Sequence, residues 1–167
     1  MSVSVDFAIR DAIASDADFL RKMLIQAVNW DTRRMTPEAE ILASPLFTPY
    51  FADWPQEGDV GLVAIDDDEP IGAAWFRSFV HQERGLGRVA DDIPVIAIGV
   101  AGSWQNRGVG RALLRALVDK ATSIGYRAVS LSVDPASFAA RVSRSEGFEV
   151  VHSESGNRTM LKTLSED

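Results

Sequence analysis

Two glycines beside a row of arginines are the residues of this sequence best suited to bind an anion. Gly108 and Gly110 lie where an apolar run passes into a helical pattern. The N-terminus of a helix presents unpaired N–H groups and a partial positive charge, and glycines let a bulky anion reach that backbone. Three arginines recur at a spacing of four residues, on one stripe of the helix: Arg107, Arg111 and Arg115. The segment therefore indicates a phosphate site.

Two common nucleotide motifs match this segment poorly. A P-loop needs Gly-Lys-Ser/Thr, whereas Gly110 is followed by Arg111-Ala112. The dinucleotide fingerprint needs a third glycine and a tight turn directly after a strand. Here residues 101–107 separate the apolar run from Gly108. An NAD(P)-binding oxidoreductase is therefore kept only as a less favoured alternative.

The composition narrows the remaining chemistry. The chain has no cysteine, which excludes disulfides, thiolate metal sites and a cysteine nucleophile. Its two histidines, His81 and His152, are far apart, so we expect no metal site. A formal net charge of -7 makes non-specific binding of nucleic acid unfavourable. The same charge is compatible with attraction of an amine substrate or simply with solubility.

The chain has the length and composition of an ordinary globular domain. Its 167 residues are 46% hydrophobic and 25% charged, and we expect a single domain over residues 1–167. No apolar run reaches the ~20 residues of a membrane span, and the N-terminus does not resemble a signal peptide. We therefore expect a cytoplasmic protein that does not bind membranes.

The elements that position the glycine segment follow from hydrophobic periodicity. Alternating or β-branched apolar runs predict strands at 5–10, 60–65, 70–79, 94–100, 128–133, 148–152 and 159–164. Apolar residues at helical spacing predict helices starting near Ser15 or Asp16 and near Pro37, and others over 108–124 and 137–146. Residues 46–54 read as a short helix or lid, and the acidic run 66–69 as a hairpin turn. The order predicts a mixed α/β (α+β) fold with a largely antiparallel, twisted sheet of about seven strands.

The stretch 98–113 resembles motif A of the GCN5-related N-acetyltransferases, the GNAT family. The family signature Gln/Arg-x-x-Gly-x-Gly/Ala is matched by Gln105, Gly108 and Gly110. Two later segments resemble the family's next strand and its closing Gly-Phe: 131–133 and 146–149. The resemblance covers most of the chain and implies a GNAT-like fold, with about four helices on both faces of the sheet. It also implies acetyl-CoA or another acyl-CoA as co-substrate.

The resemblance implies roles for individual residues. The strand that ends at Val100 should splay from the next strand and pair with the pantetheine arm of the cofactor, with Gly99 allowing a bulge. The backbone amide of Ile98 should polarise the thioester carbonyl. The residues expected to bind the cofactor are Val100, Gln105, Asn106, Arg107, Gly108, Val109, Gly110, Arg111 and Ser137.

The sequence departs from the family where protons are handled. Many members carry a tyrosine that protonates the leaving thiolate, and here Ser143 is the candidate substitute. Some members carry a glutamate base at the start of the motif A strand, where this chain has Pro94. Asp92 is the candidate base, acting through water, with a water chain to bulk solvent as the alternative.

The acceptor pocket is expected to involve Trp30, Trp54, Trp75 and Arg77, with core packing as the alternative for at least two of the tryptophans. The function predicted is direct acetyl transfer from acetyl-CoA to a primary amine of a small molecule or peptide, in a ternary complex. A GNAT module that binds CoA without catalysis is the main alternative. A homodimer is possible because dimers are common in the family.

Overall fold

The computed structural model describes residues 7–79, 87–154 and 156–164. Parts of the predicted first strand, and His81, lie outside the described residues. The described strands form a seven-stranded sheet in the order β1-β2-β3-β4-β5-β7-β6. Their bounds are β1 Ala8–Asp11, β2 Val60–Asp66, β3 Glu69–Arg77, β4 Val95–Val100, β5 Ala128–Val133, β6 Glu149–Glu154 and β7 Asn157–Thr163. All neighbouring strands are antiparallel except β4 and β5, so the predicted fold class is confirmed.

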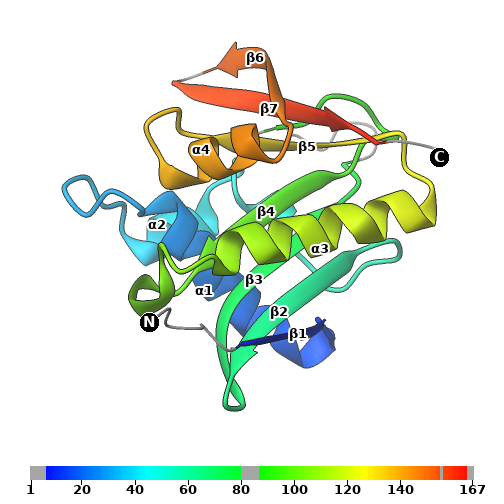
Figure 1. Ribbon diagram of the computed structural model, residues 1–167. Coiled ribbons are helices and arrows are strands. Elements are labelled where there is room, and N and C mark those ends of the chain that lie inside the picture. Colours follow the sequence, from blue (N-terminus) through cyan, green and yellow to red (C-terminus); the bar gives the residue numbers. More distant parts are fainter. Residues whose placement is uncertain (1–6, 80–86, 155, 165–167) are drawn as a thin grey trace, which may run out of the picture.

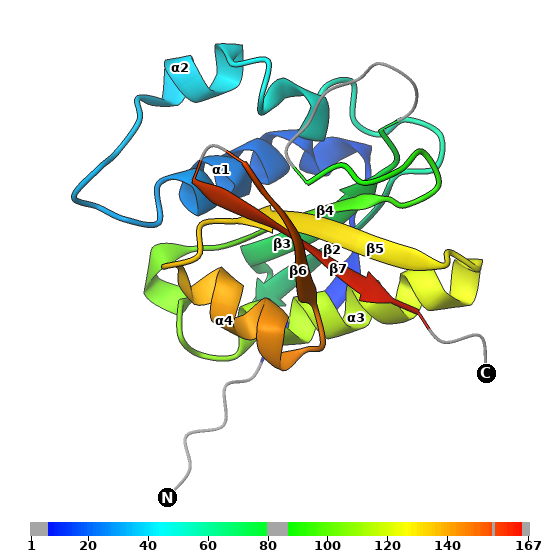
Figure 2. The same cartoon turned by 90° about the horizontal axis from the view of Figure 1, so that it is seen from above.

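The four described α-helices cover both faces of the sheet, as Figures 1 and 2 show. They are α1 Ala17–Val28, α2 Glu38–Ala43, α3 Val109–Ile124 and α4 Phe138–Ser145. Helices α1 and α2 lie on one face, and α3 and α4 on the other. Two apolar clusters result, one beneath α3 around Phe76 and Leu113, and one beneath α1 around Leu20 and Trp75. The connection from β4 through α3 to β5 is the predicted parallel crossover.

The acidic run between β2 and β3 forms the predicted hairpin turn. Asp66 pairs with Glu69 at the end of the ladder. Asp67 and Asp68 occupy the two turn positions with φ of 50° and 69°. Positive φ at both central positions matches the twist of a two-residue hairpin, and aspartate tolerates this conformation better than most residues.

Gly99 brings α1 into direct contact with the backbone of β4. A Cβ atom at this position would lie 2.1 Å from the carbonyl oxygen of Met23 in α1. The register of β3 with β4 runs without a shift from Gly72↔Val100 to Arg77↔Val95. The predicted bulge at Gly99 is therefore wrong. This glycine is needed because a helix backbone crosses the strand there.

Candidate active site

Among the described residues, strand β4 has a stretch beyond Ile96 whose backbone is not paired with β5. The two strands pair only at Val95↔Ser130 and Ile96↔Leu131, although β4 continues to Val100. The N–H of Ala101 donates to the carbonyl of Ile71 at 2.8 Å, so the odd-numbered residues of this stretch direct their backbone groups toward β3. Because bonding direction alternates along a strand, residues 96, 98 and 100 point their backbone groups toward β5.

The strands therefore separate beside Ile98, where the family resemblance implies that the thioester of the cofactor lies. Beyond Ile96, the described part of β5 offers no partner to the edge of β4. The N–H groups of Ile98 and Val100 face that gap, and the carbonyl of Val100 accepts a bond from the Gln105 side chain at 3.1 Å. A chain segment or an extended ligand can pair with such an edge through backbone hydrogen bonds alone.

The N-terminus of α3 lies directly after this edge. Gly108 is the N-cap residue with φ of 85°, and no side chain caps the helix there. A Cβ atom at Gly108 would meet nothing within 4 Å, so the approach to the helix end is open. Asn106 also has a left-handed backbone, with φ of 64°. These turns leave the first N–H groups of a helix of 16 residues pointing outward, an arrangement that can bind an anion.

Arg107 is held beside the helix end by an aromatic ring. Its guanidinium carbon lies 5.1 Å from the centre of the Trp104 ring, in a cation–π contact. Residues 105–108 are all exposed. The stacked arginine therefore keeps its N–H donors available for an anion. Trp104 was not among the predicted site residues, although its i, i+3 spacing to Arg107 is visible in the sequence.

Arg111 and Arg115 are tied to α4 by Glu146, a residue that the sequence did not single out. Arg111 donates to a carboxylate oxygen of Glu146 at 2.8 Å and to the Ser145 hydroxyl at 2.7 Å. Arg115 donates to Glu146 at 2.6 Å. Hydrogen bonds from Arg115, and then from Arg111, hold the pKa of Glu146 below its usual range. Arg111 is thus fixed between the two helices, with its side chain 39% exposed at the edge of the anion site.

The two candidate serines occupy different places on α4. Ser137 is the N-cap: its hydroxyl accepts from the N–H of Ala140 at 3.2 Å and donates to the carbonyl of Asp134 at 2.7 Å. This arrangement is that of a structural cap, and the role of Ser137 in cofactor binding stays a prediction. Ser143 is 2% exposed and is the buried hydroxyl residue within α4.

Asp92 does not suit the role of a base. It forms a two-pronged ion pair with Arg127, with contacts of 2.5 and 3.0 Å. That hydrogen bonding lowers the pKa of Asp92. The residue also precedes β4, at the end of the strand opposite Val100. A carboxylate that is paired and harder to protonate is a weaker proton acceptor, so this prediction is corrected.

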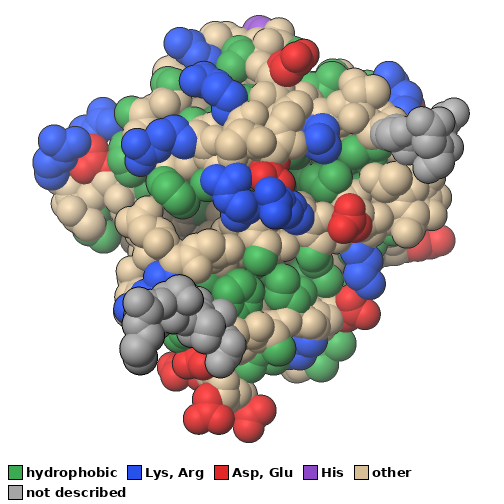
Figure 3. All heavy atoms as spheres, in the orientation of Figure 1, with side chains coloured by type: hydrophobic (Ala, Val, Ile, Leu, Met, Phe, Trp, Pro, Cys, Tyr) green, Lys and Arg blue, Asp and Glu red, His purple; other side chains and the backbone are tan. Residues whose placement is uncertain are grey.

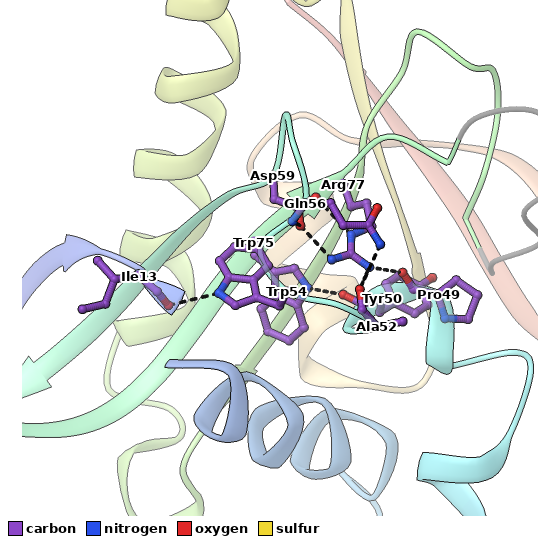
Figure 4. A network of polar contacts seen from close by, with 9 residues as sticks. All are labelled: Ile13, Pro49, Tyr50, Ala52, Trp54, Gln56, Asp59, Trp75 and Arg77. Atoms are coloured by element: carbon purple, nitrogen blue, oxygen red, sulfur yellow. Dashed lines mark hydrogen bonds and ion pairs between the residues drawn. The ribbon is translucent and has the colours of Figure 1, made fainter. Parts of the chain in front are cut away.

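Arg77 and Trp75 do not line an acceptor pocket, because the fold itself uses their polar groups (Figure 4). Arg77 is 2% exposed and forms an ion pair with Asp59 at 2.7 Å. It also donates to the carbonyls of Pro49 and Ala52 at 2.9 and 2.7 Å. The Trp75 indole N–H donates to the carbonyl of Tyr50 at 2.7 Å. Together these contacts anchor the segment before β2 onto β3.

The other two tryptophans are partly buried. Trp54 donates its indole N–H to the carbonyl of Ile13 at 3.1 Å, and its ring packs against the cluster beneath α1 (Figure 4). Trp30 follows α1 in the loop before α2. The buried Asn29 closes this loop through hydrogen bonds to the N–H and carbonyl of Thr36. The roles of Trp30 and Trp54 in the acceptor pocket stay predictions.

Other features add no second chemical centre within the described residues. A cleft of about 800 Å³ lies between β1, β2 and the C-terminal half of α3, away from the glycine segment. No group of three or more His, Asp or Glu side chains in the described ranges could hold a metal ion. No described helix is long and apolar enough to cross a membrane.

The fold is that of known acetyltransferase structures. A phosphinothricin acetyltransferase from Sinorhizobium meliloti, solved with AcCoA, superposes with a TM-score of 0.65 at 23% identity, over 96% of this chain and 89% of that one. The PaiA N-acetyltransferase from Thermoplasma acidophilum, solved with coenzyme A, gives 0.70 at 14% identity, over 95% and 99%. The ribosomal-protein-S18-alanine N-acetyltransferase from Escherichia coli gives 0.66 at 18% identity, over 96% and 95%.

The family model of the acetyltransferase (GNAT) family matches residues 24–142. The chain therefore belongs to the GNAT acetyltransferase family. The match includes the β4 edge, the glycine segment and most of the helices that surround them. No curated protein matches the sequence.

Proposed function

We propose that the protein transfers an acetyl group from acetyl-CoA directly to a primary amine of a small molecule or peptide. The observation that carries this proposal is the free edge of β4 leading into the open N-terminus of α3. An extended amide-containing arm can pair with the edge while a pyrophosphate lies on the helix end. In acetyl-CoA the amide-containing pantetheine arm joins the pyrophosphate at one end to the thioester at the other. Similar structures were solved with AcCoA and with coenzyme A, which supports the choice.

The backbone amide of Ile98 is the proposed electrophilic group. It faces the gap on the same edge as Val100, one pleat farther from the helix end. As the amine attacks the thioester carbon, negative charge develops on the carbonyl oxygen. An N–H fixed in a sheet needs no reorganisation to stabilise that charge, and one such donor contributes about 3 kcal/mol in other acyl transfers.

Proton transfers at nitrogen and at sulfur complete the reaction. The acceptor ammonium must lose a proton before the amine attacks, and we propose water connected to bulk solvent as the acceptor because Asp92 is engaged by Arg127. The departing thiolate must gain a proton, and we propose the buried hydroxyl of Ser143 as its donor, which regains the second proton that the attacking nitrogen loses as the thiolate leaves. The products are then an acetylated amine and free CoA. Proton transfer through water suits a site that is open to solvent better than a site that excludes it.

Calorimetry with acetyl-CoA on Gly108→Glu and Gly108→Gln tests the cofactor site. Both side chains enter the same open space with the same backbone strain, so their difference isolates the charge. Like charges about 5 Å apart repel by ~3 kcal/mol at an effective dielectric constant of 20, and solvent exposure reduces this. We expect the Glu variant to bind about 10- to 100-fold more weakly than the Gln variant. Equal affinities, or no binding by the wild type, would overturn the assignment.

A mass-shift screen of amines with acetyl-CoA tests the reaction itself. Transfer adds an acetyl group to one amine class and releases CoA thiol in equal amount. Binding of acetyl-CoA without transfer to any amine would instead support a CoA-binding module without catalysis. The serine at position 143, where many family members have a tyrosine, is the feature that favours this second candidate.

A further inference from the structure

Some arginines of this acidic protein are paired with carboxylates and others are not. Most described arginines contact a carboxylate, on every part of the fold: Arg10, Arg21, Arg33, Arg34, Arg77, Arg88, Arg111, Arg115 and Arg127. Four described arginines have no carboxylate partner among the described side chains: Arg107, Arg141 and Arg144, on or beside α3 and α4, and Arg158 on β7. In a chain with a net charge of -7, three of the four unpaired arginines therefore lie on or beside these two helices.

Figure 3 shows basic side chains gathered over α4 and the N-terminal half of α3. Both helices begin at the same end of the molecule (Figure 1). The carboxylate of Glu146 is already shared between two arginines in this patch. The positive field that remains is thus directed outward, beside the helix end assigned to the pyrophosphate.

One stripe of α4 points toward the start of α3. Ser145 contacts Arg111, which is in the first turn of α3. Phe138, Arg141 and Ser145 follow at i, i+3 and i+7, so they lie on the same side of α4. Arg141 is therefore one turn, about 6 Å, from Ser145 along the helix. It extends the anion site of α3 along α4.

Arg141 is also held in place while staying exposed. Its guanidinium carbon lies 5.5 Å from the centre of the Phe138 ring. Phe138 is 44% exposed, an unusual state for an aromatic ring in the first turn of a helix packed on a sheet. A stacked guanidinium keeps its N–H groups directed sideways, where they can bind a phosphate through two hydrogen bonds.

We propose that Arg141, oriented by Phe138, binds the 3′-phosphate of the CoA adenosine and makes the protein select CoA over 3′-dephospho-CoA. The inference rests on the proposed function, because the pyrophosphate on α3 sets where the adenosine end lies. CoA carries a 3′-phosphate dianion in addition to its pyrophosphate. Helix α3 supplies one set of donors, and the α4 stripe supplies a second, separate one. Two sites on neighbouring helices match two phosphate groups on one ligand.

The test compares the dissociation constants of CoA and 3′-dephospho-CoA for the wild type, Arg141→Gln and Arg144→Gln. Arg144 is on the same helix and equally unpaired, but lies roughly a quarter turn away from the stripe. Both variants remove one positive charge from an exposed position, so neither threatens the fold. We expect the wild type to prefer CoA by about 10-fold, as one charge-assisted contact provides. Arg141→Gln should bind the two ligands within about 2-fold of each other, and Arg144→Gln should keep the preference.

The possible results distinguish this inference from the proposed function on which it rests. If the wild type binds both ligands equally well, the 3′-phosphate assignment is wrong while acetyl-CoA binding stands. If both variants lose the preference equally, general electrostatic attraction replaces the specific contact and the role of Arg141 is refuted. If the wild type binds neither ligand, the proposed function itself fails. Partial loss of the preference in Phe138→Ala would support the orienting role of the ring.

Discussion

Replacing Gly99 by alanine should disrupt the contact between α1 and β4. The new Cβ atom would lie 2.1 Å from the carbonyl oxygen of Met23, 2.8 Å from its carbonyl carbon and 3.1 Å from its Cα. Non-bonded carbon and oxygen atoms rarely approach within about 3 Å, so the helix backbone must move by about 1 Å. All three contacts are with main chain, and no side-chain rotation can relieve them. The close packing of α1 on β4 must therefore open.

The cost follows from overpacking in a rigid core. Such substitutions destabilise by about 1–3 kcal/mol, and a backbone clash on this scale belongs at the upper end. For a domain of this size, ~3 kcal/mol corresponds to a loss of roughly 6–12 °C in Tm. Urea unfolding followed by circular dichroism gives the free energy directly. Gly102→Ala is the matched control, because the nearest atom to its Cβ is 3.8 Å away, and we expect it within about 0.5 kcal/mol of wild type.

A double variant checks the mechanism. Truncating Met23 to alanine removes its side chain but leaves the carbonyl oxygen in place, so it cannot rescue Gly99→Ala. We expect Gly99→Ala with Met23→Ala to be less stable than Gly99→Ala alone, since Met23 is itself buried. A Gly99→Ala variant as stable as the wild type, or rescue by the second substitution, would refute the assigned backbone contact.

Three further predictions concern buried charge, pH and proton transfer. Asp59→Asn leaves the guanidinium of Arg77 uncompensated in the core and should cost about 3–5 kcal/mol of unfolding free energy in urea; a cost below about 1 kcal/mol would contradict the buried pair. Because the pKa of Glu146 is lowered in the folded state, its stabilising effect is present above its unfolded pKa, near 4.5, and is lost as the pH falls through the folded value. Glu146→Gln should therefore flatten the acid side of the stability–pH profile, and an unchanged profile would count against the ion pair. Ser143→Ala should lower kcat about 100-fold, with little change in KM for acetyl-CoA, whereas Asp92→Asn should keep the wild-type rate; a Ser143→Ala enzyme with full kcat would remove Ser143 from the mechanism.

Local patterns predicted most of the elements because their causes are local. The hairpin at 66–69 follows from turn residues between two apolar runs, and α3 follows from its apolar face and the stop at Gly125. The bounds of strands and helices agree with the predicted ranges within a few residues. Helix ends depend on which capping contacts form, and here Asn29 turns the chain by bonding to Thr36.

The candidate site likewise has parts that local spacing predicted and parts that it could not predict. Short-range spacing identified the glycine segment and its place before α3. The partners of the predicted polar residues could not be read from spacing. Arg77 at the end of β3 forms an ion pair with Asp59, which directly precedes the neighbouring strand β2. Asp92 precedes β4 and pairs with Arg127, which precedes β5. Those pairs remove Arg77 and Asp92 from the reacting groups, because a charge that is already paired is a poor recognition group and a poor base.

The sequence by itself determined that Gln105 to Gly110 would form a turn at the start of a helix, because glycine conformation and helix polarity are properties of adjacent residues. Only the tertiary structure decided that β4 separates from β5 after Ile96, which leaves the amides of Ile98 and Val100 facing a gap. It also decided that Gly99 serves a helix crossing instead of a bulge, and that Arg141 stacks on the ring of Phe138. These features arise where elements distant in the chain meet, and their geometry depends on packing that local spacing does not encode.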